Sequence, residues 1–238
     1  MRPIAQILDV KGGNDYSFYY AFQAGLDSNS IGGVCMEYYD KPFALGMLSK
    51  AVKFASGNHA EMKGMLVIHN QTFVDTLVSF CSHYDHNANF TRHRYVPSEG
   101  LIQTMKENAT AYTAKPEDGQ WKRLVDSYGN YAKGCDPHAN EITQTMIAAC
   151  YNVQFRFYCQ KDEGVPRLHY KIGNPGAQVI AIFCNPAHGA VYKAMLMSVK
   201  DLERLGTDDT CCIKIVKDIN DPPMRMCQQC WKPIPPQI

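Results

Sequence analysis

The sequence lacks the long apolar runs and the blocks of like charge that direct a chain to a membrane or to a polyanion. No stretch approaches the roughly 20 apolar residues that a membrane-spanning helix needs. Lys and Arg number 24 against 23 Asp and Glu, so a net charge of +1 creates no bulk field for nucleic acid or anionic lipid. Asp9 and Lys11 interrupt the apolar start, so no signal peptide is expected. We therefore expect a soluble intracellular protein, cytoplasmic or nuclear, without a membrane or nucleic-acid partner.

Cysteine is too scarce to form a disulfide scaffold. The chain has 10 cysteines in 238 residues, and a chain of this length can bury a core without cross-links. Reduced thiols are therefore expected. A hydrophobic share of 45% and a charged share of 20% are ordinary for a globular protein, and they indicate one large domain or a domain with an insertion.

The spacing of apolar residues predicts an α+β protein. Residues 4–10 are an apolar run typical of a strand, and a Gly-Gly-Asn-Asp turn leads from it into a helix from Ser17 to about Gly25. Residues 31–97 are expected to form a helical lobe inserted beside the main fold, whose core is residues 1–30 and 98–199. Within the core, Trp121, Leu124, Val125 and Tyr128 recur at helical spacing and predict a helix over residues 117–131.

Three strands are expected in the second half of the core. Residues 153–159 alternate in the manner of a strand with one buried face. Residues 178–184 are almost continuously apolar, which is typical of a central strand covered on both faces. Residues 190–199 follow as another strand. Together the elements predict a small central sheet between helical layers.

A stop and restart signal lies between the expected helices. After the helix over residues 117–131, Asp136 is expected to cap the next helix, with Pro137 in its first helical position. The pKa of a thiol near a helix start can be lowered, so Cys135 is a candidate nucleophile, as an alternative to Ser17.

The turn before the first helix has features that are typical of a turn that positions a catalytic nucleophile. Backbone N–H groups at a helix N-terminus stabilise a developing anion, and the glycines before Ser17 allow close approach of a substrate. The alternative is a plain turn in which Asp15 caps a core helix.

Three pieces of the chain, in order, resemble the ovarian-tumour (OTU) family of cysteine isopeptidases. Residues 14–21, Asn-Asp-Tyr-Ser-Phe-Tyr-Tyr-Ala, are similar to the family's nucleophile pattern, with Ser17 in the cysteine position. The glycine-containing turn, Glu-Ile helix and strand of residues 134–155 are similar to the family's middle segment. Residues 179–184 followed by His188 are similar to the strand and loop that deliver the catalytic histidine.

The resemblance implies a papain-like fold and a ubiquitin or ubiquitin-like partner. It places Ser17 as the nucleophile, His188 as the base, and Asn14 or Asp15 as the group that orients the imidazole. Backbone donors around Gly13 and Tyr16 would hold the oxyanion.

This chain departs from the family pattern at the catalytic positions. A serine hydroxyl ionises far less readily than a thiol, so a site tuned for a thiolate activates Ser17 poorly. Asn14 stands where the family often has an aspartate, and Gly189 follows His188 where the family usually has an aromatic residue. The chain is then a natural pseudoenzyme, or its cysteine was replaced on purpose to trap a substrate.

Two stretches carry candidate zinc ligands. Cys227 and Cys230 form a Cys-x-x-Cys half-site in the tail, whose partner pair would be Cys211 and Cys212. Residues 81–94 hold a cysteine and three histidines that bind a metal or belong to a solvated polar loop. No other cofactor is expected.

The leading hypothesis is an OTU-like domain that binds ubiquitin or a related modifier and is silenced by Ser17. A second hypothesis is a non-catalytic scaffold that contacts a different protein through residues 31–97 or the cysteine-rich, proline-rich extension 200–238. A third is a zinc-dependent nucleic-acid module built on Cys227 and Cys230, against which the near-neutral net charge argues.

Overall fold

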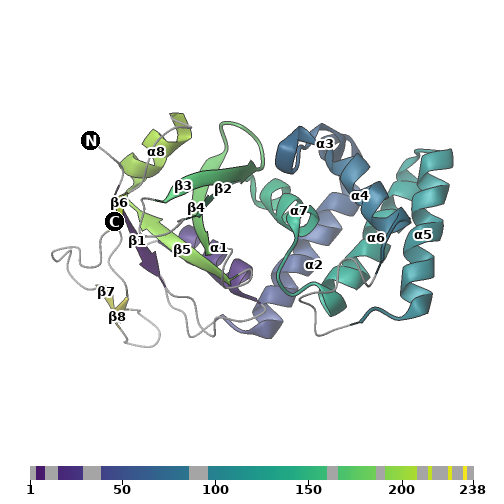
Figure 1. Cartoon of the computed structure of the whole chain (residues 1–238), viewed down its shortest axis with the longest axis horizontal. Coiled ribbons are helices and arrows are strands. Elements are labelled where there is room, and N and C mark those ends of the chain that lie inside the picture. Colours follow the sequence, from purple (N-terminus) through teal and green to yellow (C-terminus); the bar gives the residue numbers. More distant parts are fainter. Residues whose placement is uncertain are drawn as a thin grey trace. The chain divides into compact units, whose positions relative to one another are not determined.

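A computed structural model of the chain describes residues 4–8, 16–28, 39–85, 96–159, 166–185, 191–207, 214–215, 225–226 and 233–234. The chain divides into two compact units (Figure 1). The first comprises Met1–Ala44, Val153–Lys171 and Pro175–Ile238, and the second Leu45–Asn152 and Ile172–Asn174. None of the described helices is long and apolar enough to cross a membrane.

A mixed sheet organises the first unit. Its strands are β1 (Ile4–Leu8), β2 (Val153–Cys159), β3 (Arg167–Ile172), β4 (Gln178–Asn185), β5 (Val191–Met197) and the short β6 (Lys214–Ile215). Their spatial order is β3-β2-β4-β5-β1-β6. β2 runs parallel to β4, whereas β5 is antiparallel to both β4 and β1. The expected α+β class is confirmed.

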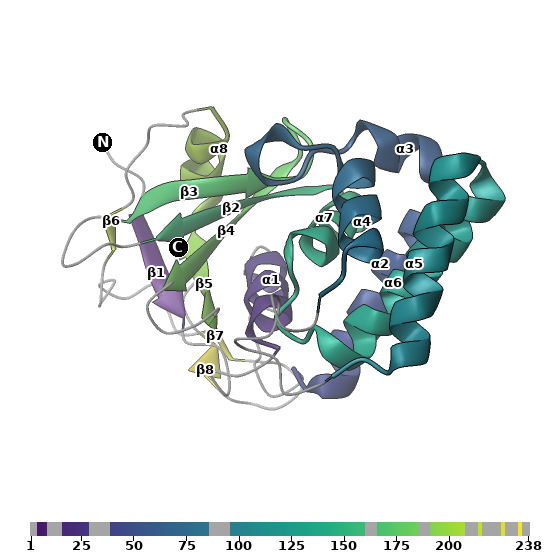
Figure 2. The same cartoon turned by 45° about the vertical axis from the view of Figure 1, so that its right-hand side comes forward.

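Helices cover both faces of this sheet. The helix α1 (Ser17–Asp27) packs against β4 and β5, and α8 (Val199–Thr207) packs against β4. Successive side chains of a strand point to opposite faces. In β4, Val179, Ala181 and Phe183 belong to one buried cluster with Leu205 of α8, whereas Ile180 lies against Gly25 of α1. The two helices therefore lie on opposite faces, seen also in Figures 1 and 2.

Residues 153–159 were expected to bury only one face, and this expectation was wrong. All the residues of β2 are buried. β2 lies between β3 and β4 in the sheet, and its two faces are both covered. A strand in that position buries the side chains of both faces whatever its alternation predicts.

The second unit is helical. It contains most of α2 (Lys41–Gly57), α3 (His59–Gly64), the 3-10 turn η2 (Ile68–Asn70), α4 (Phe73–Ser82), α5 (Glu99–Ala114), α6 (Asp118–Cys135) and α7 (Glu141–Tyr151). α5 packs along α6 and against α4 (Figure 2). The predicted inward face of α6 is confirmed, because Trp121, Leu124, Val125 and Tyr128 are all fully buried.

The predicted restart after α6 was wrong in its details. α7 begins at Glu141 rather than at Pro137. Its cap is Asn140, whose side-chain oxygen accepts hydrogen bonds from the backbone N–H groups of Ile142 and Thr143. Asp136 instead accepts from the backbone N–H of Asn140, at 3.0 Å, and so closes the turn between the helices.

The unit boundaries do not coincide with the expected lobe of residues 31–97, which stays a prediction. The C-terminal extension contributes α8 and β6 to the first unit. The two-residue strands β7 (Arg225–Met226) and β8 (Pro233–Ile234) pair with each other.

Candidate functional site

Ser17 is the first residue of α1 and is completely buried. Its hydroxyl oxygen accepts a hydrogen bond of 3.1 Å from the backbone N–H of Tyr192 in β5. The preceding residue, Tyr16, occupies the N-cap position but its side chain makes no capping hydrogen bond. The helix begins there through its backbone carbonyl, which accepts from the N–H of Tyr20 at 3.3 Å.

Aromatic side chains fix the start of α1 against the sheet. The ring centroid of Phe18 lies 5.2 Å from that of Phe155 and 5.5 Å from that of Tyr192, both in edge-to-face geometry. Phe22, one turn later, packs edge-to-face on Phe155 at 5.1 Å. Such pairs add to the energy of apolar burial, so the aromatic run that follows Ser17 anchors the residue in place.

The strand that contacts Ser17 belongs to an antiparallel pair with a short connection. Cys184 pairs with Tyr192 in the register of β4 and β5, and Asn185 pairs with Val191. His188 belongs to the connection, residues 186–190, which lies outside the described residues. Tyr192, which contacts Ser17, is therefore only a few residues along the chain from His188, the predicted base.

The remaining predicted site residues also fall outside the described part of the chain. They are Gly13, Asn14 and Asp15 before the helix, and Cys227 and Cys230 in the tail. Of the predicted site, the structure thus describes Ser17 and Tyr16.

Cys135 does not have the surroundings of a nucleophile, which corrects the expectation of an acidified thiol. It is the last residue of α6 rather than the residue before a helix start. Burial, reinforced by the neighbouring Asp136 carboxyl, raises the pKa of its thiol. Cys135 therefore lacks the lowered pKa that an activated catalytic thiol has.

The histidine-rich stretch at the end of α4 gives no sign of a metal site in its described part. Cys81 is fully buried, and burial raises the pKa of its thiol to about 12. The Nδ1 atom of His83 lies 3.1 Å from the carbonyl of Ser79 in the same helix. Within the described ranges no three His, Cys, Asp or Glu side chains are grouped to hold a metal ion.

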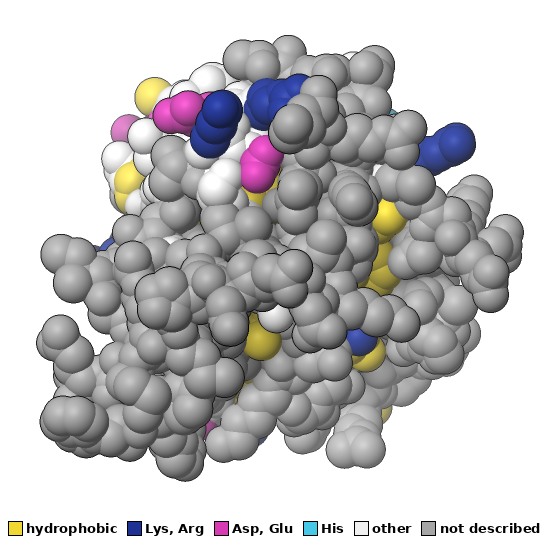
Figure 3. All heavy atoms as spheres, turned by 90° about the vertical axis from the view of Figure 1, so that its left-hand side faces the viewer, with side chains coloured by type: hydrophobic (Ala, Val, Ile, Leu, Met, Phe, Trp, Pro, Cys, Tyr) yellow, Lys and Arg dark blue, Asp and Glu magenta, His cyan; other side chains and the backbone are white. Residues whose placement is uncertain are grey.

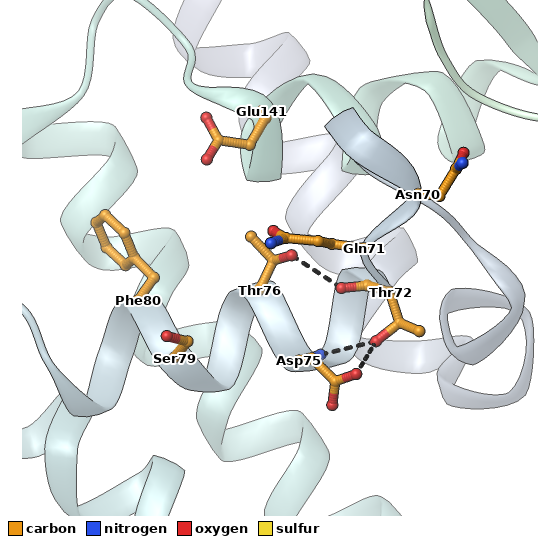
Figure 4. A pocket seen from close by; sticks show the side chains of 8 residues that line it. All are labelled: Asn70, Gln71, Thr72, Asp75, Thr76, Ser79, Phe80 and Glu141. Atoms are coloured by element: carbon orange, nitrogen blue, oxygen red, sulfur yellow. Dashed lines mark hydrogen bonds between the residues drawn. The ribbon is translucent and has the colours of Figure 1, made fainter.

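A polar pocket of about 520 Å³ lies in the second unit (Figure 4). It is lined by residues of α4 and of the segment before it, with Glu141 from α7. The Thr72 hydroxyl caps α4 by accepting from the N–H of Asp75 at 3.1 Å, and Thr76 donates to the Thr72 carbonyl at 2.9 Å. These polar groups are therefore engaged in forming the helix start.

Sequence analysis missed a hydrogen-bonded group formed by His59, Asp118 and Tyr112. His59 places Nδ1 2.8 Å from an Asp118 oxygen and Nε2 2.8 Å from the Tyr112 hydroxyl. Its ring also stacks on Trp121 with centroids 4.6 Å apart. His59 and Trp121 are buried, whereas Asp118 is almost fully exposed. Because His59 belongs to α3, Tyr112 to α5, and Asp118 and Trp121 to α6, the group connects α3 to both of these helices. No local signal predicts it, because the partners are more than 50 residues from His59.

The described surface of the first unit carries charges of both signs. Figure 3 shows basic and acidic side chains next to each other on the face it presents. On α8, Lys200 and Glu203 are both exposed.

The Ser17 region is the candidate functional site that these observations support. A hydroxyl at a helix N-terminus, and a strand N–H that holds it next to a short connection bearing a histidine, come from two distant parts of the sequence. Helix N-termini favour negative charge, so this end of α1 can stabilise an oxyanion. Comparisons of the chain with models of known protein families, with curated proteins and with solved structures found no match.

Proposed function

We propose that the chain is an OTU-like domain that binds ubiquitin or a ubiquitin-like modifier. Position 17 is its nucleophile position and His188 its base, so the active form would be a thiol isopeptidase. With serine at position 17 the domain binds its modifier without efficient turnover.

One observation carries the proposal: the backbone N–H of Tyr192 donates to the Ser17 hydroxyl at 3.1 Å. The two residues are 175 positions apart in the chain, and His188 precedes Tyr192 by four. Four residues of extended chain span at most about 14 Å. The contact therefore limits how far His188 can lie from Ser17, as expected if Ser17 and His188 share a catalytic site.

Burial of the Ser17 hydroxyl limits what can reach position 17. The Ser17 hydroxyl is fully buried, and its oxygen already accepts a hydrogen bond. A serine is activated by a base that removes its proton, and its oxygen must reach the substrate carbonyl. A fully buried side chain at position 17 reaches a substrate only if the chain around it moves, whether it is serine or cysteine, so the poorer ionisation of the serine hydroxyl is what separates the two.

The test uses ubiquitin that carries an electrophile at its C-terminus. The chain as written, Ser17→Cys, and Ser17→Cys/His188→Ala are each exposed to this probe, and adducts are counted by intact mass. Because serine alone is proposed to silence the site, we expect an adduct with Ser17→Cys and at least a tenfold slower reaction when His188 is also removed. The chain as written should form none.

A matched control is Ser17→Cys/His169→Ala, since His169 is an exposed histidine on β3 of the same unit. This variant should react like Ser17→Cys. If a folded Ser17→Cys protein forms no adduct, the isopeptidase site is refuted. Ubiquitin binding that is also absent would then favour a scaffold for another protein.

A further inference from the structure

Cys159 and Cys184 bring two thiols together at the ends of neighbouring strands. The parallel register of β2 and β4 pairs Tyr158 with Phe183, so the next step along both strands places Cys159 beside Cys184. Their sulfur atoms are 2.7 Å apart. Alternate residues of a strand share a face, so Cys159 lies on the same face as Phe157 in β2, and Cys184 on the same face as Ile182 in β4. This is the face that packs against α1, because Phe157 stacks on Phe18.

This geometry suits a disulfide better than a shared metal ion. Adjacent strands lie about 4.8 Å apart, within the Cα separation of about 4.4–6.8 Å that disulfides bridge. Two thiolates on one tetrahedral zinc, with Zn–S bonds of about 2.3 Å, would be about 3.8 Å apart. The observed sulfur separation is well short of that value, and the described residues supply no further metal ligands.

The two thiols are unequal in their surroundings. Cys159 is 9% exposed, whereas Cys184 is half-buried. The hydrogen bond with Cys159, followed by burial, raises the pKa of the Cys184 thiol. In the reduced protein the S–H of one cysteine is directed at the sulfur of the other.

We propose that Cys159 and Cys184 are a reversible redox site that a peroxide converts to an intrachain disulfide. Hydrogen peroxide oxidises one thiol to a sulfenic acid and releases water. The second sulfur then attacks the sulfenic sulfur, an S–S bond forms, and a second water leaves. Over both steps the two sulfurs lose two electrons, the peroxide gains them, and its O–O bond breaks.

The site adjoins the candidate functional site. Cys184 pairs with Tyr192, whose N–H holds the Ser17 hydroxyl. The disulfide would fasten the carboxyl ends of β2 and β4, where β4 leads into residues 186–190. The inference does not depend on the function proposed for Ser17, because the pair and its test involve no ubiquitin.

The test maps the cysteines of the full chain after exposure to hydrogen peroxide. Cleavage after Lys and Arg releases residues 157–161 and residues 172–193, each with a single cysteine. We expect these peptides to appear linked, with a mass two hydrogens below their sum, and to separate on reduction by a thiol. The linked species should be the dominant disulfide of the folded protein.

Three variants sharpen the result. Cys159→Ser and Cys184→Ser should each abolish the link, and Cys150→Ser, which changes a half-buried cysteine of α7, should leave it unchanged. The unmodified chain decides the proposal even if a variant fails to fold. Peptides 157–161 and 172–193 that both remain free thiols in folded, peroxide-treated protein would overturn it. So would a link that forms only after denaturation.

Discussion

Asp136 is a carboxyl group enclosed by the second unit. It is 1% exposed, and burial raises its pKa to about 7, with the charge of Glu141 acting in the same direction. Hydrogen bonds from the Asn140 backbone and the Thr143 side chain act in the opposite direction but do not offset burial. The carboxyl therefore gains a proton in the folded protein within the physiological pH range.

This shift predicts that the protein loses stability as pH rises. The folded state holds the Asp136 proton up to about pH 7 but the unfolded state releases it near pH 4, so folding is favoured at low pH and weakened above. The contribution should fall by about 2–3 kcal/mol between pH 5 and pH 8. Asp136→Asn keeps an oxygen for the Asn140 N–H and does not titrate, so its free energy of unfolding should lack this decrease.

Urea unfolding at pH 5 and pH 8 measures the difference. Asp126→Asn is the matched control, because Asp126 lies on the exposed side of α6. It should follow the pH profile of the unchanged chain. Parallel profiles for the unchanged chain and Asp136→Asn would contradict the raised pKa.

At the scale of the elements, His59 ties the short helix α3 to its neighbours. A carboxylate only accepts hydrogen bonds, so Nδ1 of His59 carries a hydrogen toward Asp118, and Nε2 forms the second hydrogen bond with the Tyr112 hydroxyl. α3 has only six residues and cannot be stable alone. Its place therefore depends on this side chain and on the stack against Trp121.

His59→Ala should cost about 2–3 kcal/mol in the free energy of unfolding, because it removes buried packing and leaves the Tyr112 hydroxyl without this partner. Asp118→Ala should cost less than about 1 kcal/mol, since Asp118 is 94% exposed and water replaces the contact. The free energies of unfolding of both variants, measured by chemical denaturation, show whether the packing of His59 or its contact with Asp118 matters more for α3. Equal losses would show that the hydrogen bond to Asp118, not the packing, holds α3.

At the scale of the whole molecule, each of the two units contains a glycine in close contact with an apolar side chain of the same unit. Gly25 of α1 faces Ile180 of the sheet, and a Cβ atom there would lie 2.8 Å from the Ile180 Cγ2. Gly129 of α6 faces Val52 of α2, and a Cβ atom there would lie 2.6 Å from the Val52 Cγ1. Each glycine thus permits a close contact inside one unit.

Alanine at either position should overpack its own unit, at a cost of about 1–3 kcal/mol. Hydrogen exchange followed by mass spectrometry should become faster mainly in the first unit for Gly25→Ala and mainly in the second for Gly129→Ala. Gly46→Ala, in the middle of α2 with open space around it, should not speed exchange. Faster exchange throughout the chain for both Gly25→Ala and Gly129→Ala would mean that the units unfold together.

Much of the local structure follows from short-range patterns in the sequence. The helix from Ser17 and the buried face of α6 were both predictable, because each depends on residues within a few positions of one another. The restart at Asp136 failed because two nearby residues could each cap a helix, and side-chain geometry selected Asn140. For the candidate site, the sequence supplied Ser17 and its place at a helix start. The role of Ser17 and that of His188 stay predictions.

Other features were decided only by the tertiary structure. The hydrogen bond to Ser17, the fastening of α3 by His59 and the pairing of Cys159 with Cys184 each join residues at least 25 positions apart. The burial of both faces of β2 and the raised pKa of Asp136 likewise depend on which elements cover them. Local propensity acts over a few residues, whereas burial and distant contacts exist only after the chain has folded. The sequence therefore determined the elements and their apolar faces, and packing determined which polar groups meet.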